Sequence, residues 1–281
     1  MKILIIDRDE TAAATLGEAI SKAGYEVEHV ATCEDALALL GSDEYNAVFF
    51  DPAPLPEYRQ EFQNLRRATR NNLYMTITGD DLPARDVLLS GANDILAKPF
   101  DLERLPARLE NIKRLQKLVR DIGNTAEDFP SAGGVISKSA FNQLFLSCLD
   151  RASRYAERSY ALFMGIDNVK QIQMIHGAHA ADFAAARLAR HLVELRRQSD
   201  IIAQTGKAEH ALLLQRPIFE TEPMEAANRF AAALKELSDF SDIDGAPIDI
   251  RVELVELPSG AVPVRHDFTC TSGNSHNEEE E

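Results

Sequence analysis

Short apolar runs alternate with amphipathic segments along the first 120 residues. Each run is three to five residues long, and the segment that follows places apolar residues at helical spacing. The pattern predicts strands at 3–6, 27–30, 47–50, 73–77 and 95–97. It predicts a first helix that ends at 23, three helices at 34–40, 58–68 and 84–89, and a last helix that starts at 101. Apolar strands separated by helices are typical of a parallel sheet that is covered on both faces.

The second half of the chain has a different pattern. Helices are predicted at 137–158, 167–175, 180–197 and from 221, and strands at 160–166, 201–204, 210–215 and 248–254. In the last strand apolar residues alternate with Asp249, Arg251 and Glu253, which indicates an antiparallel strand with one solvated face. We therefore expect an α/β domain at 1–120, a linker at 121–133 and an α+β domain at 134–257.

The helix that starts at 101 continues towards the linker with an apolar stripe. The stripe consists of Leu105, Leu109, Ile112, Leu115 and Val119. Residues at this spacing lie on one helix face. Two interpretations stay open, because the stripe can pack on the chain's own sheet or on a second copy of the chain.

Composition narrows the class of protein. The chain has 281 residues with 45% apolar content, enough for two cores. Its 45 acidic and 30 basic residues give a net charge of −15, which disfavours binding to nucleic-acid phosphates. No apolar run is long enough to span a membrane, and neither the cysteines nor the histidines have metal-ligand spacing. We expect a cytoplasmic protein without a metal site, and a disordered acidic tail at 258–281.

Polar residues stand at the ends of four strands of the first domain: Asp7, Asp51, Thr78 and Lys98. Sites in parallel sheets lie outside the carboxyl ends of the strands. With the stretches ILIIDRDE, YNAVFFD, TITGDD and GANDILAKPF, this domain resembles the receiver domain of bacterial two-component response regulators, which is a doubly wound, five-stranded, flavodoxin-like fold. The resemblance implies that Asp51 is the phosphoacceptor, that the Thr78 hydroxyl binds the phosphoryl oxygen, and that Lys98 pairs with it.

Arg8 departs from the receiver pattern. It stands where the family usually has the second acid of a Mg²⁺-binding pair. A guanidinium disfavours Mg²⁺, which takes oxygen ligands, and we expect Arg8 to pair with Asp51 instead. Ile95 replaces the aromatic residue that reports phosphorylation in many receivers. Two interpretations stay open: Asp51 and Lys98 are relics in a scaffold, or a sensor histidine kinase phosphorylates Asp51.

The second domain resembles the GGDEF domain of diguanylate cyclases. The resemblance rests on ALFMGIDNVKQIQMIHGAHAAD and DIIAQTGKAEHALLL. That family condenses two GTP molecules with metal ions held by carboxylates of the first strand and of a hairpin. Here these two positions are Gly165 and Ala208, whose side chains have no oxygen. We therefore interpret the domain as degenerate and expect no cyclase activity.

Further positions of the family's site are altered. The degenerate active-site positions are Gly165, Gln173, Asp182, Gly206, Lys207, Ala208, Glu209 and His210. Lys207 places a bulky cation where the family has its second glycine, Gln173 replaces a base-reading Asn, and His210 replaces a Phe. Asp182 and Glu209 match acids that contact or support guanine, but we do not expect them to hold a metal alone.

Residues 197–200, Arg-Gln-Ser-Asp, stand just ahead of the hairpin. They match the RxxD inhibitory site at which active family members bind cyclic di-GMP. An Arg can donate two hydrogen bonds to a phosphate or a guanine edge, and an Asp can accept from guanine N–H groups. The alternative is that Asp200 caps a turn and Arg197 is a solvated charge.

Together these features predict a bacterial signalling protein that has no catalytic activity and requires no cofactor. The leading hypothesis is a response regulator that binds cyclic di-GMP through Arg197 and Asp200 and acts through protein partners. The rival hypothesis is a nucleotide-independent adaptor in a two-component pathway. The expected partners are a sensor histidine kinase, proteins of signalling or polar complexes, and a second copy of the chain, but not DNA.

Overall fold

The computed structural model describes residues 1–42, 44–53, 58–69, 73–80, 84–129, 133–197, 200–236 and 247–270. Residues 198–199 of the RxxD motif and 271–281 of the tail lie outside the described residues. The chain divides into two compact units. The first contains Met1–Gly123, Leu146–Arg158 and Leu257–Ala261, and the second contains Asn124–Phe145, Ser159–Glu256 and the residues from Val262 onward.

The first unit contains a five-stranded parallel sheet of order β2-β1-β3-β4-β5. Its strands are β1 (Lys2–Ile6), β2 (Glu26–Val30), β3 (Ala47–Phe50), β4 (Tyr74–Gly79) and β5 (Asp94–Ala97). The helices that follow them are α1 (Glu10–Lys22), α2 (Cys33–Ser42), α3 (Arg59–Ala68), α4 (Ala84–Leu89) and α5 (Leu105–Gly123). The five predicted strand and helix pairs and the doubly wound fold are confirmed.

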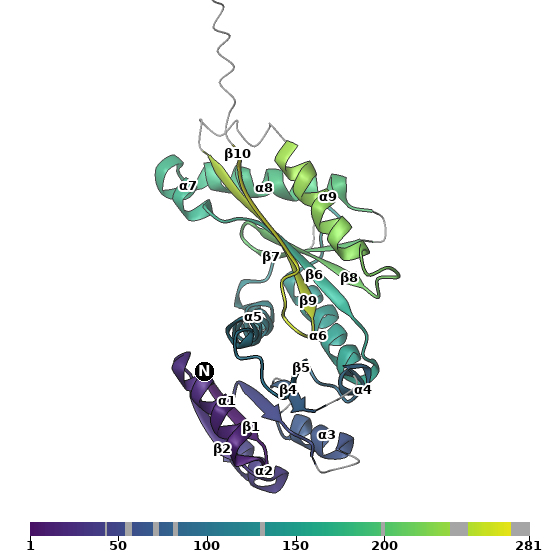
Figure 1. The fold of residues 1–281 in the computed structure, drawn as a ribbon. Coiled ribbons are helices and arrows are strands. Elements are labelled where there is room, and N and C mark those ends of the chain that lie inside the picture. Colours follow the sequence, from purple (N-terminus) through teal and green to yellow (C-terminus); the bar gives the residue numbers. More distant parts are fainter. Residues whose placement is uncertain are drawn as a thin grey trace, which may run out of the picture. The chain divides into compact units, whose positions relative to one another are not determined.

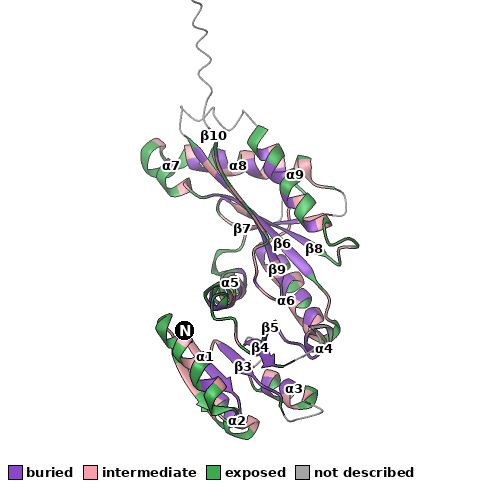
Figure 2. Ribbon diagram, viewed as in Figure 1, coloured by how far each residue is buried: buried purple, intermediate pink, exposed green. Residues whose placement is uncertain are grey.

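Burial explains the continuous apolar strands of this sheet. All four residues of β3 and all six of β4 are buried, because helices cover the sheet (Figure 2). Phe50 packs against Phe62 of α3, with ring centroids 6.0 Å apart. Each large apolar side chain buried in this way stabilises the fold by about 2 kcal/mol.

The apolar stripe of α5 is buried inside the first unit. Leu105, Leu109, Ile112 and Leu115 are each at most 5% exposed. The stripe therefore packs within the chain, so of the two interpretations the structure supports intramolecular packing. These four side chains are not available to a second copy.

The second unit contains a mainly antiparallel sheet of order β10-β9-β6-β8-β7. Its strands are β6 (Ser159–Ile166), β7 (Ile201–Gly206), β8 (Glu209–Gln215), β9 (Ile248–Leu257) and β10 (Val264–Cys270). The remaining helices are η1 (Thr125–Glu127), α6 (Lys138–Tyr155), α7 (Val169–His176), α8 (Ala178–Leu195) and α9 (Glu222–Glu236). The predicted α+β class is confirmed.

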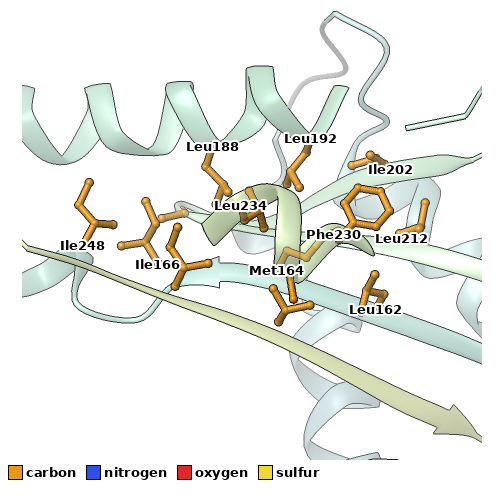
Figure 3. Close-up of a cluster of buried hydrophobic side chains, with 14 of the residues drawn as sticks. Leu162, Met164, Ile166, Leu188, Leu192, Ile202, Leu212, Phe230, Leu234 and Ile248 are labelled. Carbon is orange, nitrogen blue, oxygen red and sulfur yellow. The ribbon is translucent and has the colours of Figure 1, made fainter. Parts of the chain in front are cut away.

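Helices α8 and α9 cover one face of this sheet (Figure 1). The core between these helices and the sheet contains apolar side chains of both helices and of the strands (Figure 3). Leu188 and Leu192 of α8 and Phe230 and Leu234 of α9 are completely buried there. This packing fixes the positions of β6 and β8, which carry Gly165, Glu209 and His210 of the candidate site.

The expected disordered tail is wrong for part of its length. Residues Val264–Cys270 form β10, which pairs with β9 along an unbroken antiparallel register. Apolar Val264 and Phe268 pack against the core, whereas Arg265 and Asp267 are exposed. Apolar and polar side chains alternate along this segment, so its apolar side chains all lie on the core face of a strand. The segment therefore forms a strand although its composition is polar.

Candidate functional site

The sheet of the first unit brings Asp7 and Asp51 together with Lys98. Asp7 follows β1, Asp51 follows β3, and both are buried. The Lys98 ammonium lies 2.8 Å from Asp7 Oδ2 and forms an ion pair with Asp51 Oδ2. Thr78 is buried near the end of β4, the next strand in the sheet.

Every carboxylate oxygen of this pair has a partner. Oδ1 of Asp7 accepts from the backbone N–H of Asp9 at 2.9 Å, and Oδ1 of Asp51 accepts from that of Ala53 at 2.7 Å. Both Oδ2 atoms face Lys98. Burial opposes the charge on Lys98, but hydrogen bonds and Coulombic attraction from the two carboxylates outweigh it, so the pKa of Lys98 is raised.

The expected pairing of Arg8 with Asp51 is wrong. Arg8 is exposed, and within the described part of the chain no ion pair joins it to Asp51. Arg8 lies in the bend between β1 and α1, where its side chain is in solvent and Asp7 is buried. The carboxylate of Asp9 accepts from Thr11 and Ala12 N–H groups and caps α1.

The second candidate site lies where β6 ends beside the β7–β8 hairpin. Gly206 pairs with Glu209, so Lys207 and Ala208 form the turn. Ile166 donates its N–H to the carbonyl of Ala208 at 3.0 Å, which ties the hairpin to β6. A Cβ added at Gly165 would lie 3.2 Å from that carbonyl oxygen. The two positions predicted to have lost their acids are therefore close together.

A cation from β9 lies among the remaining carboxylates. Arg251 contacts Asp167 at 3.0 Å, Glu209 at 2.9 Å and Glu253 at 2.9 Å, each through a different guanidinium nitrogen. Thr205 donates a further hydrogen bond to Glu209 at 2.9 Å. Burial opposes the charge on Arg251, but the hydrogen bonds and attraction of Asp167 and Glu209 outweigh it and raise its pKa.

Sequence reasoning missed this role of Arg251. The strand alternation placed Arg251 on a solvated face, but its side chain is only 19% exposed because carboxylates surround it. A polar face that carries Asp249, Arg251 and Glu253 on one strand was the available signal. The contact with Asp167 and Glu209 depends on the sheet order and is not visible in the sequence.

The position that matches the guanine-contacting acid is also paired with a cation. Lys207 of the hairpin lies 3.0 Å from Asp182 of α8. Both side chains are about half exposed, at 50% and 59%. Gln173 on α7 is exposed. The sequence places the bulky Lys207 cation where the family has its second glycine, and the structure shows that its partner is Asp182.

Arg197 and Asp200 are hydrogen-bonded to each other just ahead of β7. The Asp200 carboxylate accepts the backbone N–H of Arg197 at 2.8 Å, and the N–H of Asp200 donates to the Arg197 carbonyl at 3.0 Å. Arg229 of α9 lies 3.7 Å from the same carboxylate. The Arg197 side chain is exposed. The Asp200 carboxylate is thus held by the backbone of Arg197 and lies beside the Arg229 side chain of α9.

His210 of β8 is buried in the apolar core and is 1% exposed. Neither ring nitrogen has a hydrogen-bond partner among the described residues. Burial lowers the pKa of His210 to about 4. The ring is therefore neutral at pH 7 and occupies the core as a hydrophobic group would.

Family comparisons agree with both halves of this description. Residues 3–110 match the response regulator receiver domain, and residues 131–255 match the diguanylate cyclase GGDEF domain. The chain therefore combines a receiver domain with a GGDEF domain, an architecture of response-regulator signalling proteins. No helix in the described ranges is long and apolar enough to cross a membrane.

Similar curated proteins match over part of the chain. The response regulator MprA of Mycobacterium avium (strain 104) is 34% identical over 141 residues, which are 46% of this chain and 58% of the relative. The transcriptional regulatory protein HprR of Escherichia coli (strain K12) is 33% identical over 111 residues, or 39% and 50%. The chain spans about half the length of the curated relatives it matches.

Solved structures match over a similar share. A two-component response regulator from Clostridium difficile is 25% identical, with 41% of this chain and 96% of that chain covered and a TM-score of 0.38. A putative response regulator from Chloroflexus aurantiacus J-10-fl is 29% identical, with 40% and 95% covered and a TM-score of 0.36.

Proposed function

We propose that this protein is a response regulator that acts by binding and does not synthesise cyclic di-GMP. One observation carries the proposal: the guanidinium of Arg251 lies among Asp167, Glu209 and Glu253. A divalent cation at these carboxylates would be repelled by a fixed positive charge and would have to displace its hydrogen bonds. The residues present do not fit a catalytic metal.

The backbone around Gly165 supports the same proposal. By resemblance to the family, Gly165 and Ala208 take the places of metal-binding acids. A Cβ added at Gly165 would lie 3.2 Å from the Ala208 carbonyl oxygen, which is a crowded contact. Ala208 is 5% exposed and belongs to the core. A carboxylate at either position would have to move the hairpin or enter an apolar environment.

We propose further that the GGDEF domain binds cyclic di-GMP at Arg197 and Asp200. The exposed guanidinium of Arg197 is free to turn towards a phosphate, and Arg229 adds a second cation beside Asp200. The chain has a net charge of −15, so cations near Asp200 would offset part of the general repulsion of an anionic ligand. Bidentate arginine contacts with a phosphate are among the stronger hydrogen bonds in proteins.

One observation favours the rival function, a nucleotide-independent adaptor. The Asp200 carboxylate already accepts the Arg197 N–H at 2.8 Å and faces Arg229. A guanine edge would have to compete for these oxygens. In that case the turn has only a structural role, and both domains serve as surfaces for protein partners.

Calorimetric titration with cyclic di-GMP separates the two functions. We expect binding by the native chain and at least a tenfold loss of affinity in Arg197→Ala, which corresponds to about 1.4 kcal/mol. Arg190→Ala, an exposed arginine of α8 outside the motif, is the matched control and should bind as the native chain does. No heat with the native chain, or equal affinity in Arg197→Ala, supports the adaptor instead.

A direct assay tests the absence of turnover. The native chain is incubated with GTP and Mg²⁺ or Mn²⁺, and cyclic di-GMP is measured by chromatography and mass spectrometry. We expect no product above the level of a heat-denatured sample. Product formation would overturn the proposal, whatever the outcome of the binding experiment.

We infer that the receiver half is a scaffold and is not switched by phosphorylation. All four carboxylate oxygens of Asp7 and Asp51 have partners, and the Lys98 ammonium offsets one of the two negative charges. The alternative is phosphorylation of Asp51 by a sensor kinase. The protein is treated with acetyl phosphate and Mg²⁺, with Asp51→Asn as control. An acid-labile phosphoryl adduct on the native chain alone would support the alternative and refute the scaffold.

A further inference from the structure

The open edge of β10 stands apart from the sites described above. β10 ends the sheet order of the second unit and is hydrogen-bonded to β9 on one side. In the described part of the chain no strand pairs with its other side. Its backbone N–H and C=O groups on that side are therefore available for strand pairing.

The opposite edge of the same sheet is covered. Ile136 donates its N–H to the carbonyl of Ile202 at 2.9 Å and accepts from Gln204 at 3.3 Å, which closes part of the β7 edge. β10 also lacks two of the features that commonly protect an edge, a proline and a bulge. Residues Val264–Cys270 contain neither Pro nor Lys, and their register with β9 has no shift.

The sequence of β10 is complementary to itself. Two antiparallel copies with their twofold axis at His266 place Arg265 of one copy opposite Asp267 of the other, twice. On the other face the same register places Val264 opposite Phe268 of the second copy. Both oppositely charged pairs and both apolar pairs form in this single arrangement.

The charges along the β10 edge also favour a second copy of this chain as the partner. The chain has a net charge of −15, so two copies repel each other on average. The exposed face of β10 carries Arg265, Asp267 and Thr269, whose charges sum to zero. Within one chain Arg265 and Asp267 already lie 2.8 Å apart, which holds both side chains on that face.

We propose that β10 pairs with β10 of a second copy of this chain, so that two sheets join into one continuous sheet. The interface is isologous and centred on His266. It is independent of nucleotide binding, since Arg197 and Asp200 lie at β7, the other edge of the sheet. A pairing of seven residues is small, so we expect a weak, concentration-dependent dimer.

Charge exchange across the edge tests the proposal. Sedimentation velocity is measured from about 1 to about 200 µM, a range suited to a small interface. We expect the native chain to dimerise at the upper end. Arg265→Glu sets a carboxylate opposite Asp267 of the second copy, and Asp267→Arg sets a guanidinium opposite Arg265. Because like charges then face each other, each variant alone should dissociate at least tenfold more readily.

An equimolar mixture of the two variants restores both attractive pairs. We expect the mixture to dimerise as the native chain does, which also shows that neither variant is misfolded. Arg104→Glu, the same substitution as Arg265→Glu but at an exposed position outside β10, is the matched control and should dimerise normally. A native chain that stays monomeric, single variants that dimerise like the native chain, or a mixture that stays monomeric would each overturn the proposal.

Discussion

Acid should destabilise the second unit through His210. Its pKa is about 4 in the folded chain, against an ordinary value of 6.5, because burial opposes the charged ring. The unfolded chain therefore binds more protons between these two values. The stabilisation from the neutral ring is complete above about pH 6.5 and is lost as the pH falls towards 4.

The shift gives the size of the effect. A difference of 2.5 pH units at about 1.4 kcal/mol per unit corresponds to about 3 kcal/mol lost between pH 7 and pH 4. His210 is 1% exposed and lacks a hydrogen-bond partner among the described residues, so solvent and neighbours do not relieve the cost. This is a large part of the stability of an ordinary domain.

Urea denaturation at pH 7, 6, 5 and 4 measures the effect, with circular dichroism as the signal. His210→Phe keeps an apolar ring in the core and removes the titration. We expect the free energy of unfolding of the native chain to fall by about 3 kcal/mol relative to this variant. His179→Asn, at an exposed position, is the control and should follow the native curve.

Parallel stability curves for the native chain and His210→Phe between pH 7 and pH 4 would refute the reasoning. They would mean that the ring finds a partner or solvent when it becomes protonated. A second variant, His210→Met, separates the loss of titration from any overpacking by phenylalanine, because the flexible Met side chain adapts to the available space. In both variants the free energy of unfolding should change less between pH 7 and pH 4 than it does in the native chain.

Three further outcomes are expected. Arg251→Met leaves the surrounding carboxylates without their cation and should lower the free energy of unfolding by about 2 kcal/mol, measured by urea titration. The control Arg104→Met removes an exposed ion pair and should change the free energy of unfolding by less than about 0.5 kcal/mol. The double variant Gly165→Asp with Ala208→Glu should form no cyclic di-GMP from GTP, because Arg251 still occupies the site; measurable product would contradict this explanation. Leu188→Ala, at a completely buried position, should cost about 3 kcal/mol, seen as a lower melting temperature; an unchanged value would contradict the packing.

The sequence by itself determined most of the secondary structure and the parallel sheet of the first unit. Apolar runs such as β3 must be buried on both faces, and the helices between them make the sheet parallel. That arrangement also predicts that Asp7, Asp51 and Lys98 converge, because the carboxyl ends of parallel strands share one edge. These inferences depend on spacing along the chain, which a sequence contains directly.

Two predictions were wrong because they were based on the kind of residue and not on its position in the chain. The segment that contains Val264–Cys270 is polar on average, yet its apolar residues alternate with polar ones and form β10. Arg8 was likewise judged by its type, although its side chain lies in solvent at the bend between β1 and α1. In both cases the direction of the side chains decided the outcome, and the kind of residue did not.

The tertiary structure alone decided which charges meet. Arg251 comes from β9, Asp167 from the segment after β6, and Glu209 from β8; they lie together because β6 stands between β8 and β9 in the sheet. The pairing of Lys207 with Asp182 likewise joins a hairpin to a helix. An ion pair needs atoms within about 4 Å, and sequence patterns fix such distances only within one element. The sequence pointed to Lys207 in the hairpin, but the carboxylates that Lys207 and Arg251 contact could be identified only in the folded chain.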